Sequence, residues 1–326
     1  MTQIVTLGEV LIDLTQTGTD ENGIPQFKAF PGGAPANVAV AASRLGAKTG
    51  FIGKIGKDAF GMQLRETLET DAVDTSFLFE TEEVPTTLAI VSVDGKGERS
   101  FSFYREPGAD TQLNINEAMA FLEGDLPFIL HFGSLSLTTE PSRGAALNAV
   151  SQAREKGVLI SYDPNYRAAL WKSADEAVRW MRTPLEMTDI LKISDEELVL
   201  LTGTDDLLEG SRRLGEYGIR LIMITLGSKG VFYRLRGAGD QTGDISGTVP
   251  AEAVQVCDTN GAGDTFLGAV LSQLAMMHDE TGASVTDLDA AGLESILAFA
   301  NRAAALTCAR AGAIPAMPTA KELGEQ

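Results

Sequence analysis

Short apolar runs alternate along the chain with longer segments whose apolar residues recur at helical spacing. The short runs predict strands at residues 4–7, 48–52, 129–132, 158–162, 190–193, 221–225 and 231–235. The longer segments predict helices at residues 36–45, 59–70, 141–156, 174–187, 195–201, 207–217, 266–277 and 293–309. Alternating strands and helices are typical of a mostly parallel sheet with helices on both faces, so we expect an α/β fold.

Two parts of the chain depart from this alternation. Residues 16–31 are polar and rich in glycine and proline, which is typical of a turn or an edge hairpin. Residues 87–91 and 99–104 alternate apolar and polar side chains, and the sequence DGKG at 94–97 predicts a hairpin turn between them. This hairpin could belong to the edge of the main sheet. Residues 237–250 show neither pattern and are expected to form a loop.

Length and composition allow one large α/β domain or two smaller ones, because the chain has 326 residues and is 44% hydrophobic. It carries 26 basic and 45 acidic residues, and the resulting net charge of −19 argues against nucleic acid and anionic membranes as partners. The simplest consequence of such a charge is solubility. A site for an anionic ligand would therefore need locally placed basic residues.

The cysteines, the histidines and the hydropathy of the chain bear on its cellular compartment and on metal binding. Cys257 and Cys308 lie far apart in sequence, so we expect a reducing compartment and no disulfide framework. His131 and His278 are too few to favour a histidine-based metal site. The N-terminal residues are typical of a strand rather than a signal, and no apolar run has the length of a membrane span. We therefore expect a cytoplasmic protein.

The stretch most specific for chemistry is DTNGAGDTF at residues 258–266, which leads into an apolar helix. The small residues at 261–263 allow a tight turn whose N–H groups, at a helix N-terminus, favour an anion such as phosphate. Asp264 would repel that anion unless it has a chemical task, and accepting a proton from an attacking hydroxyl is such a task. The alternative is a plain strand-to-helix turn with an acidic residue in its first turn.

Two common phosphate-binding motifs are absent from the sequence. Phe266 occupies the place of the third glycine in a dinucleotide fingerprint, and no Gly-x-x-x-x-Gly-Lys-Ser/Thr occurs anywhere in the chain. A nucleotide site in this protein would therefore have to use a different loop.

A second glycine-rich stretch precedes the first predicted helix. Gly32 and Gly33 are followed by a proline suited to a first helical turn and then by Asn37. This arrangement lets a polar ligand approach the backbone closely, with the asparagine amide as a hydrogen-bonding partner. The ordinary alternative is a tight turn with a capping or surface asparagine.

Further candidates share one position, directly after a predicted strand, where ligands bind in open α/β sheets: Asp13, Arg105, Arg167, Ser194, Glu197, Thr225 and Gly227. Each also has an ordinary explanation. Asp13 could be a turn residue, and Arg167 could pair with a surface acid. Ser194 and Glu197 could form the capping box of the helix that follows them. Their clustering at one edge is stronger evidence than any single residue.

The stretch at 258–266 resembles the signature of the pfkB family of ribokinase-like carbohydrate kinases. The two glycines and Asn37 resemble the N-terminal motif of the same family, and the resemblance extends from residue 7 to residue 313. Further stretches are similar to those of the fructokinase subgroup: residues 103–110, 132–137, 161–167, 170–171 and 191–198.

The resemblance implies a single ribokinase-like three-layer domain over residues 1–326, with a small β-sheet lid formed by segments at about 9–31 and 86–112. It implies ATP as donor, fructose as acceptor and Mg²⁺ at the phosphates. It implies Asp264 as general base and an anion hole formed by Gly261, Ala262 and Gly263. The implied sugar-side residues are Asp13, Gly32, Gly33, Asn37, Arg105 and Arg167. The implied nucleotide-side residues are Ser194, Thr225, Gly227, Gly230, Asn301 and Gly312, with Glu197 acting indirectly on Mg²⁺ and Asp258 as a candidate for K⁺.

Two departures from the family pattern affect these expectations. Ser194 stands where the general pattern has asparagine, so its phosphate or water contact differs. Ala316 lies near the position at which K⁺-activated members often have a serine, and it offers no side-chain oxygen. We therefore expect weak K⁺ dependence. The outer face of the lid is a candidate surface for a homodimer.

Alternatives to a fructokinase stay open from the residues alone. A 2-keto-3-deoxygluconate kinase is one alternative, since it shares the arginine-bearing motifs. In such an enzyme Arg105 and Arg167 could bind the carboxylate of the substrate. An aminoimidazole riboside kinase or ribose kinase is a further alternative within the family. A catalytically silent sugar-binding regulator would belong to another class, and the intact Asp264 argues against it.

Overall fold

A mostly parallel sheet forms the centre of the protein. The computed structural model describes residues 2–93, 99–237 and 243–324, and within them this sheet has nine strands in the order β13-β12-β11-β10-β9-β8-β1-β4-β5. The strands are β1 Ile4–Leu7, β4 Thr49–Gly56, β5 Asp74–Thr81, β8 Ile129–Gly133, β9 Leu159–Asp163, β10 Ile190–Ser194, β11 Leu221–Thr225, β12 Val231–Leu235 and β13 Ile245–Val249. Neighbours from β5 to β11 are parallel, and β12 and β13 are antiparallel additions. The carboxyl ends of the parallel strands therefore share one edge.

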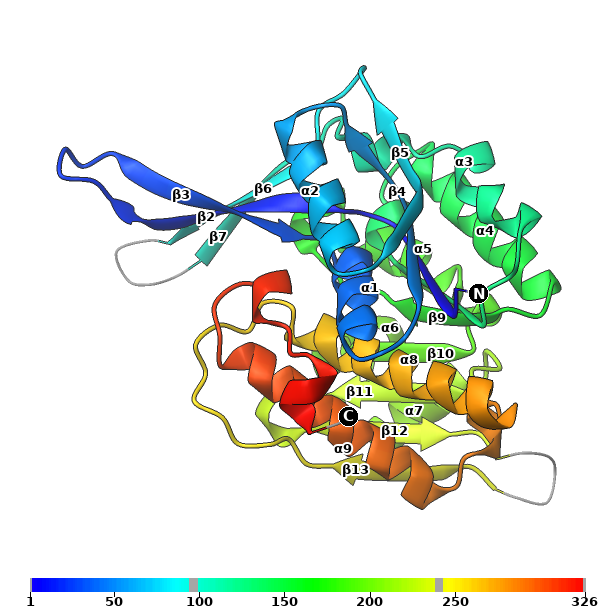
Figure 1. Ribbon diagram of the computed structural model, residues 1–326. Coiled ribbons are helices and arrows are strands. Elements are labelled where there is room, and N and C mark those ends of the chain that lie inside the picture. Colours follow the sequence, from blue (N-terminus) through cyan, green and yellow to red (C-terminus); the bar gives the residue numbers. More distant parts are fainter. Residues whose placement is uncertain (1, 94–98, 238–242, 325–326) are drawn as a thin grey trace.

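Helices cover both faces of this sheet (Figure 1). One face carries α1 Ala34–Arg44, α2 Ala59–Thr70, α8 Ala262–Thr281 and α9 Ala290–Cys308. The other carries α3 Ile115–Met119, α4 Ser142–Glu155, α5 Ala174–Arg182, α6 Asp195–Thr202 and α7 Leu207–Gly215. In β1, Ile4 packs in the apolar cluster that contains α8 and α9, whereas Val5 and Leu7 pack in the cluster that contains α4. Strands buried on both faces need continuous apolar runs, and such runs predicted them.

A smaller sheet projects from this body (Figure 1). Its strand order is β3-β2-β6-β7. The strands are β2 Leu11–Thr19, β3 Pro25–Gly32, β6 Leu88–Val93 and β7 Arg99–Tyr104. β2 is antiparallel to β3 and parallel to β6, which is antiparallel to β7. The hairpin strands thus lie outside the main sheet, and the predicted α/β class with a small second sheet is confirmed. The predicted turn at 94–97 lies outside the described residues.

Several elements differ from the sequence predictions. The stretch 237–250, expected as a loop, contains β13 in its described part, and the edge strand β5 was not predicted. Both strands alternate mostly between exposed and partly buried side chains, so neither has the continuous apolar run of a central strand. The short helix α3 was also missed. α5 ends at Arg182, earlier than expected, because Pro184 follows and residues 185–187 form a 3₁₀ turn.

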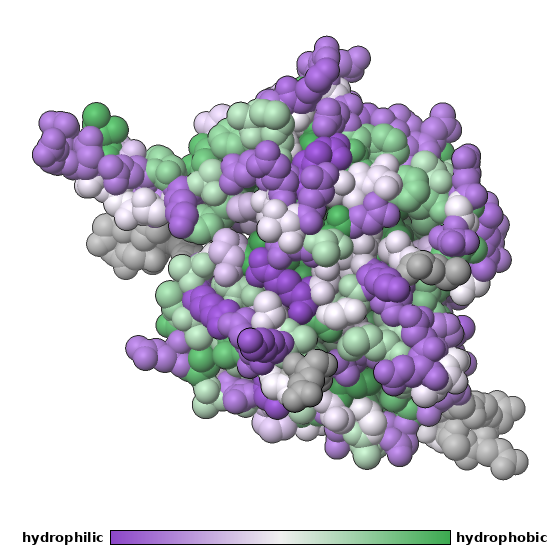
Figure 2. All heavy atoms as spheres, viewed as in Figure 1, coloured by the Kyte–Doolittle hydropathy of each residue, from purple (hydrophilic) through white to green (hydrophobic). Residues whose placement is uncertain are grey.

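Hydrophilic side chains cover most of the face shown in Figure 2, with apolar patches scattered between them. This distribution agrees with the net charge of −19. None of the helices in the described part of the chain is both long enough and apolar enough to cross a membrane.

Candidate active site

A cleft of about 690 Å³ lies where the small sheet meets the carboxyl edge of the main sheet. Its walls come from strands of the small sheet, from the start of α1 and from the loop that leads into α8. The predicted site residues that line it are Asp13, Gly33, Asn37, Arg167, Asp258, Gly261, Gly263, Asp264 and Gly312. Segments from both ends of the chain thus meet at the edge where α/β sheets bind ligands.

Asp264 lies in the first turn of α8, which begins directly after Gly261. Its Oδ2 accepts a hydrogen bond of 2.7 Å from Nδ2 of Asn37, which lies 227 residues earlier in α1. The residue is 8% exposed and faces the cleft. Among the described residues no hydrogen bond reaches its Oδ1. The asparagine amide therefore orients the carboxylate and leaves one oxygen for a ligand.

The surroundings of Asp264 tune its acidity. Burial raises the pKa of Asp264 above its ordinary value, and the negative charge of Asp163 adds to this effect. The hydrogen bond from Asn37 and the positive charges of Lys192 and Arg167 oppose the rise in pKa. A carboxylate with a raised pKa accepts a proton more readily than an ordinary aspartate, which suits a general base.

The turn at 261–263 is packed so closely that side chains larger than those present would collide. A Cβ on Gly261, whose φ is 74°, would lie 3.0 Å from Cα of Ala313. A Cβ on Gly263 would lie 3.0 Å from Nζ of Lys192. Ala262 is the first residue of α8, a helix of 20 residues whose N-terminal end lies at the cleft. Free N–H groups and the positive end of the helix dipole favour an anion here.

A buried ion pair adjoins this turn. Nζ of Lys192 in β10 donates to Oδ2 of Asp163 at the end of β9, at 2.8 Å, and their side chains are 9% and 2% exposed. Burial by itself would lower the pKa of Lys192, but the charges of Asp163, Glu197 and Asp264 raise it above its usual value. The ammonium therefore stays charged beside the anion-binding turn, and Lys192 also lines the cleft.

Asp13 enters the cleft from β2 of the small sheet. A Cβ on Gly32 would lie 2.6 Å from Oδ2 of Asp13, so glycine at this position makes room for the carboxylate. Burial raises the pKa of Asp13 to about 6, although a hydrogen bond with Asn260 and the charge of Arg167 lower it. Gly33 has a φ of 106°, and a Cβ there would lie 2.5 Å from the carbonyl oxygen of Glu9. Both glycines are thus required by packing beside the cleft.

The two arginines expected at the sugar have different environments. Arg167 is exposed at the cleft and makes no ion pair within the described ranges. Arg105 is 6% exposed, and its guanidinium pairs with Asp110 at 2.7 Å. It also donates to Oγ1 of Thr138 at 2.8 Å and to the carbonyl of Leu135 at 2.9 Å. Arg105 is not among the residues that line the cleft, and its guanidinium is held by these internal partners, so the expected sugar contact stays a prediction.

Ser194 and Glu197 form the capping box that was their ordinary explanation. Oε2 of Glu197 accepts from the backbone N–H of Ser194 at 2.8 Å, and Oε1 accepts from that of Tyr166 at 2.6 Å. Both carboxylate oxygens are therefore occupied by backbone groups. The described part of the chain contains no group of three or more His, Cys, Asp or Glu side chains arranged to hold a metal ion.

The predicted nucleotide-side residues at the end of β11 do not line the cleft: Thr225, Gly227 and Gly230. Thr225 pairs in register with Ser194, and its hydroxyl donates to the carbonyl of Ile193 at 3.2 Å. Gly227 and Gly230 have φ values of 57° and 99° in the turn that follows β11.

Asn301 and Asp258 join separate parts of the chain. Nδ2 of Asn301 donates to the carbonyl of Pro250 at 2.9 Å, which anchors α9 to the segment after β13. Oδ2 of Asp258 accepts from the N–H of Gly312 at 3.1 Å, at the cleft.

Comparison with known proteins decides the family, because residues 1–320 match the model described as pfkB family carbohydrate kinase. The chain belongs to the pfkB family of carbohydrate kinases. Fructokinase-2 from Solanum lycopersicum is 41% identical, over 98% of this chain and 94% of that protein. Fructokinase with bound ATP from Xylella fastidiosa is 33% identical, with a TM-score of 0.88 over 99% of this chain and 97% of that chain.

A second solved structure is also similar to this pfkB-family kinase. It is a fructokinase double mutant from Vibrio cholerae O395 in a form with fructose, ADP and potassium ion bound. It is 31% identical, with a TM-score of 0.85 over 99% of this chain and 97% of that chain. The ribokinase-like fold expected from the resemblance is therefore confirmed.

Glu9 is a residue of this kinase that the sequence analysis missed. It is 2% exposed and lines the cleft between β1 and β2. Its Oε1 accepts from the N–H of Ala34 at 3.1 Å, whereas Oε2 has no hydrogen-bond partner among the described residues. Burial raises the pKa of Glu9 to about 7, against its backbone hydrogen bonds and the charge of Arg105. The sequence did contain a signal for Glu9, because an acidic residue directly follows a predicted buried strand.

We expect Glu9 to make the unliganded protein less stable as the pH rises from 5 to 8. Its folded-state pKa lies above the ordinary 4.5, so its stabilising contribution is complete below about pH 4.5 and is lost as the pH rises from there to about 7. The loss is on the order of 2 kcal/mol. Urea unfolding across this range measures it, and Glu9→Gln should make the profile less steep, with Asp13, whose pKa is raised to about 6, contributing to the slope that remains. An unchanged slope in Glu9→Gln would assign the pH dependence to other groups.

Proposed function

We propose that this protein is an ATP-dependent fructokinase, which transfers the γ-phosphoryl group of ATP to a primary hydroxyl of fructose. The observation that carries the proposal is Asp264, a buried carboxylate in the first turn of α8 that faces the cleft and is oriented by Asn37. The fructokinases among the relatives, which are similar over nearly the whole chain, support the choice of acceptor.

The geometry suits proton transfer coupled to in-line phosphoryl transfer. Asp264 accepts the proton of the attacking hydroxyl as its oxygen bonds to the γ-phosphorus and the bond to the bridging oxygen of ADP breaks. The N–H groups at 261–263 and the guanidinium of Arg167 stabilise charge on the transferring group. Asp13 accepts hydrogen bonds from hydroxyls of the sugar, which Gly32, Gly33 and Asn37 help to position.

We place the nucleotide along the carboxyl edge of β10 and β11, next to the anion-binding turn, with the residues Ser194, Thr225, Gly227, Gly230, Asn301 and Gly312. Mg²⁺ on the phosphates of ATP would offset their charge. Glu197 would act on its water shell, because both carboxylate oxygens already accept backbone N–H groups. Mg²⁺ usually keeps several waters at such sites, so this arrangement fits an indirect contact.

We assign the whole chain to one kinase domain and the small sheet to a lid. The segments at about 9–31 and 86–112 would close over the sugar and exclude water, which otherwise competes as acceptor. The lid also carries exposed apolar side chains, since Ile24 is 60%, Phe27 45% and Tyr104 64% exposed. Such a surface suits a homodimer contact. Free thiols at Cys257 and Cys308 fit a cytoplasmic protein.

An acceptor comparison tests the proposed function. ADP formation is measured with fructose, 2-keto-3-deoxygluconate and ribose in one assay, and kcat/KM is compared. We expect the highest value for fructose, because Asp13 and Asn37 offer hydrogen bonds that suit a neutral polyol, and the exposed Arg167 is needed by the donor phosphates in any case. A higher value for the keto acid would favour the alternative kinase. Absence of ADP formation with every sugar would favour a silent regulator.

We expect weak dependence on K⁺, with activity falling less than about tenfold when a bulky organic cation replaces it. Ala316 offers no side-chain oxygen, and the oxygens of Asp258 accept the N–H groups of Asn260 and Gly312 at 3.0 and 3.1 Å. Steady-state rates in the two cations measure the effect. Complete loss of activity without K⁺ would show that backbone oxygens alone build a strong cation site.

A further inference from the structure

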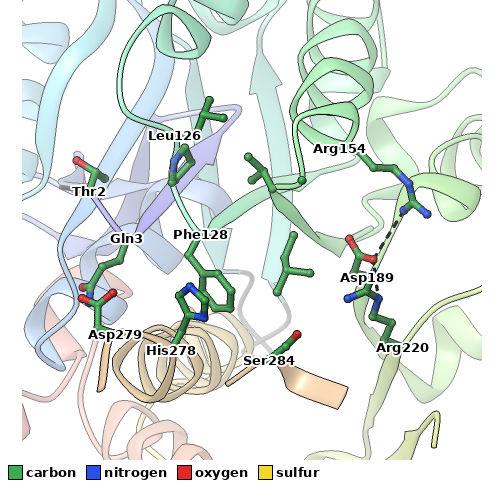
Figure 3. Close-up of a pocket in the computed structure, with 14 residues that line it drawn as sticks. Thr2, Gln3, Leu126, Phe128, Arg154, Asp189, Arg220, His278, Asp279 and Ser284 are labelled. Atoms are coloured by element: carbon green, nitrogen blue, oxygen red, sulfur yellow. Dashed lines mark hydrogen bonds and ion pairs between the residues drawn. The ribbon is translucent and has the colours of Figure 1, made fainter. Parts of the chain in front are cut away.

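A second hollow lies at the opposite edge of the main sheet, where the parallel strands begin (Figure 3). Its volume is about 590 Å³, and it is lined by residues that precede the central strands and by the C-terminal part of α8. A smaller hollow of about 350 Å³ adjoins it, and the two share Arg154, Asp189 and Arg220. Within the described ranges these hollows share no lining residue with the proposed active-site cleft.

The two arginines converge on a single carboxylate, as Figure 3 shows. Oδ1 of Asp189 lies 3.2 Å from Nε of Arg220 and 3.9 Å from Nη1 of Arg154. Oδ2 of Asp189 accepts from the backbone N–H of Ile160 at 2.9 Å, so this buried acid is fixed in place. Each guanidinium carries five N–H donors. In the described structure no side-chain hydrogen bond to another residue occupies those of either arginine, whose side chains are 40% and 41% exposed.

A third arginine adds to this positive charge. Arg236 lines the smaller hollow, and its Nη1 lies 4.0 Å from the position that a Cβ on Gly218 would take. Three arginines thus face one acid in the smaller hollow, which leaves a local excess of two positive charges in a chain of net charge −19. A pair of converging guanidinium groups matches the oxygens of a phosphate, each through two parallel N–H bonds.

The larger hollow provides room for more than an inorganic anion. Its wall contains Phe128 and His278, whose rings stack in parallel with centroids 3.8 Å apart. Asp279 also lines this hollow, and it accepts a hydrogen bond from the side chain of Gln3 at 2.5 Å, which fixes the carboxylate but leaves its charge in place. The organic part of a ligand held by the arginines could therefore extend along an aromatic wall and a polar one formed by Gln3 and Asp279.

We propose that Arg154, Arg220 and Arg236 form a binding site for a phosphate monoester, with the phosphate on the guanidinium groups and the organic part in the larger hollow. Asp189 positions two of these arginines and limits their mutual repulsion. A purely structural network would not need Arg154, since Asp189 already accepts a hydrogen bond from Ile160 and forms an ion pair with Arg220. The site is independent of the proposed kinase activity, because it lies at the other edge of the sheet.

Isothermal titration of the full chain tests the proposal, with inorganic phosphate and glycerol 3-phosphate as probes at constant ionic strength. We expect binding of both probes, tighter for the monoester. Arg236→Gln should weaken binding about tenfold, because it removes charge-assisted hydrogen bonds without disturbing Asp189. Arg154→Gln with Arg220→Gln should weaken it further. Arg302→Gln, an exposed arginine on α9, is the matched control and should bind like the wild type.

The cleft variant Arg167→Gln separates this site from the proposed active site, and it should retain the arginine-dependent binding. Unchanged affinity in Arg236→Gln and in the double variant would overturn the proposal. Equal weakening in Arg302→Gln would also overturn it, because that result would show a general effect of charge. If the double variant fails to fold, Arg236→Gln decides the question alone.

Discussion

Replacing Asp264 with asparagine is expected to lower kcat by about two to four orders of magnitude while ATP still binds, which is the range for loss of a general base. Asparagine keeps the shape of the side chain and can still interact with Asn37, but it cannot accept the hydroxyl proton. The buried carboxylate also lies beside the anion-binding turn, where its negative charge repels the phosphates. Its neutralisation should therefore not weaken the binding of ATP. Steady-state kinetics and titration with ATP measure the two quantities separately.

Asp175→Asn is the matched control for this variant. Asp175 also lies in the first turn of a helix, α5, but it is exposed and does not line the cleft. The Asp175→Asn variant should have the kcat of the wild type. If removing any acid from the first turn of a helix lowered kcat, the decrease would appear in both variants. Near-normal turnover in a folded Asp264→Asn protein would remove this residue from the chemistry and leave the cleft as a binding site.

The predictions that the structure supports best rested on short-range constraints. The turn at 261–263 and the pair Gly32 and Gly33 could be recognised because close packing and positive φ demand glycine locally. The position after a predicted strand marked Asp13 as a ligand-binding candidate. Asn37 was found from the glycine-rich stretch before it, without any knowledge of its contact with Asp264. The continuous apolar runs of the central strands were equally local signals, since burial on both faces demands them.

Long-range pairing explains what sequence reasoning missed. Arg105 and Arg167 have similar positions after predicted strands, yet the first is buried against Asp110 and the second is exposed at the cleft. Their separate roles depend on which elements pack over each side chain, and no local pattern reports this. Lys192 gave a partial signal, because a lysine within an apolar strand needs a charged partner. Its partner Asp163 lies in the neighbouring strand and could be found only once the strand order was known.

Replacement of Arg105 by methionine is expected to lower the free energy of unfolding by about 3–5 kcal/mol, the range for breaking a buried ion pair by removing one partner. The side chains of Arg105 and Asp110 are 4% and 1% exposed, so the acid would be left charged and without its cation inside the protein. The carbonyl of Leu135 and the hydroxyl of Thr138 would lose a donor as well. Urea unfolding monitored by circular dichroism measures the change.

Two further variants separate structural support from substrate contact. Arg105→Met with Asp110→Asn should regain much of the lost stability, because the buried charge disappears with its partner. Arg167→Met should leave the free energy of unfolding within about 0.5 kcal/mol of the wild type, as expected for an exposed residue, and should lower kcat instead. If Arg105→Met were fully stable but had a raised KM for the sugar, Arg105 would be a substrate ligand, and its guanidinium would have to leave Asp110 when the sugar binds.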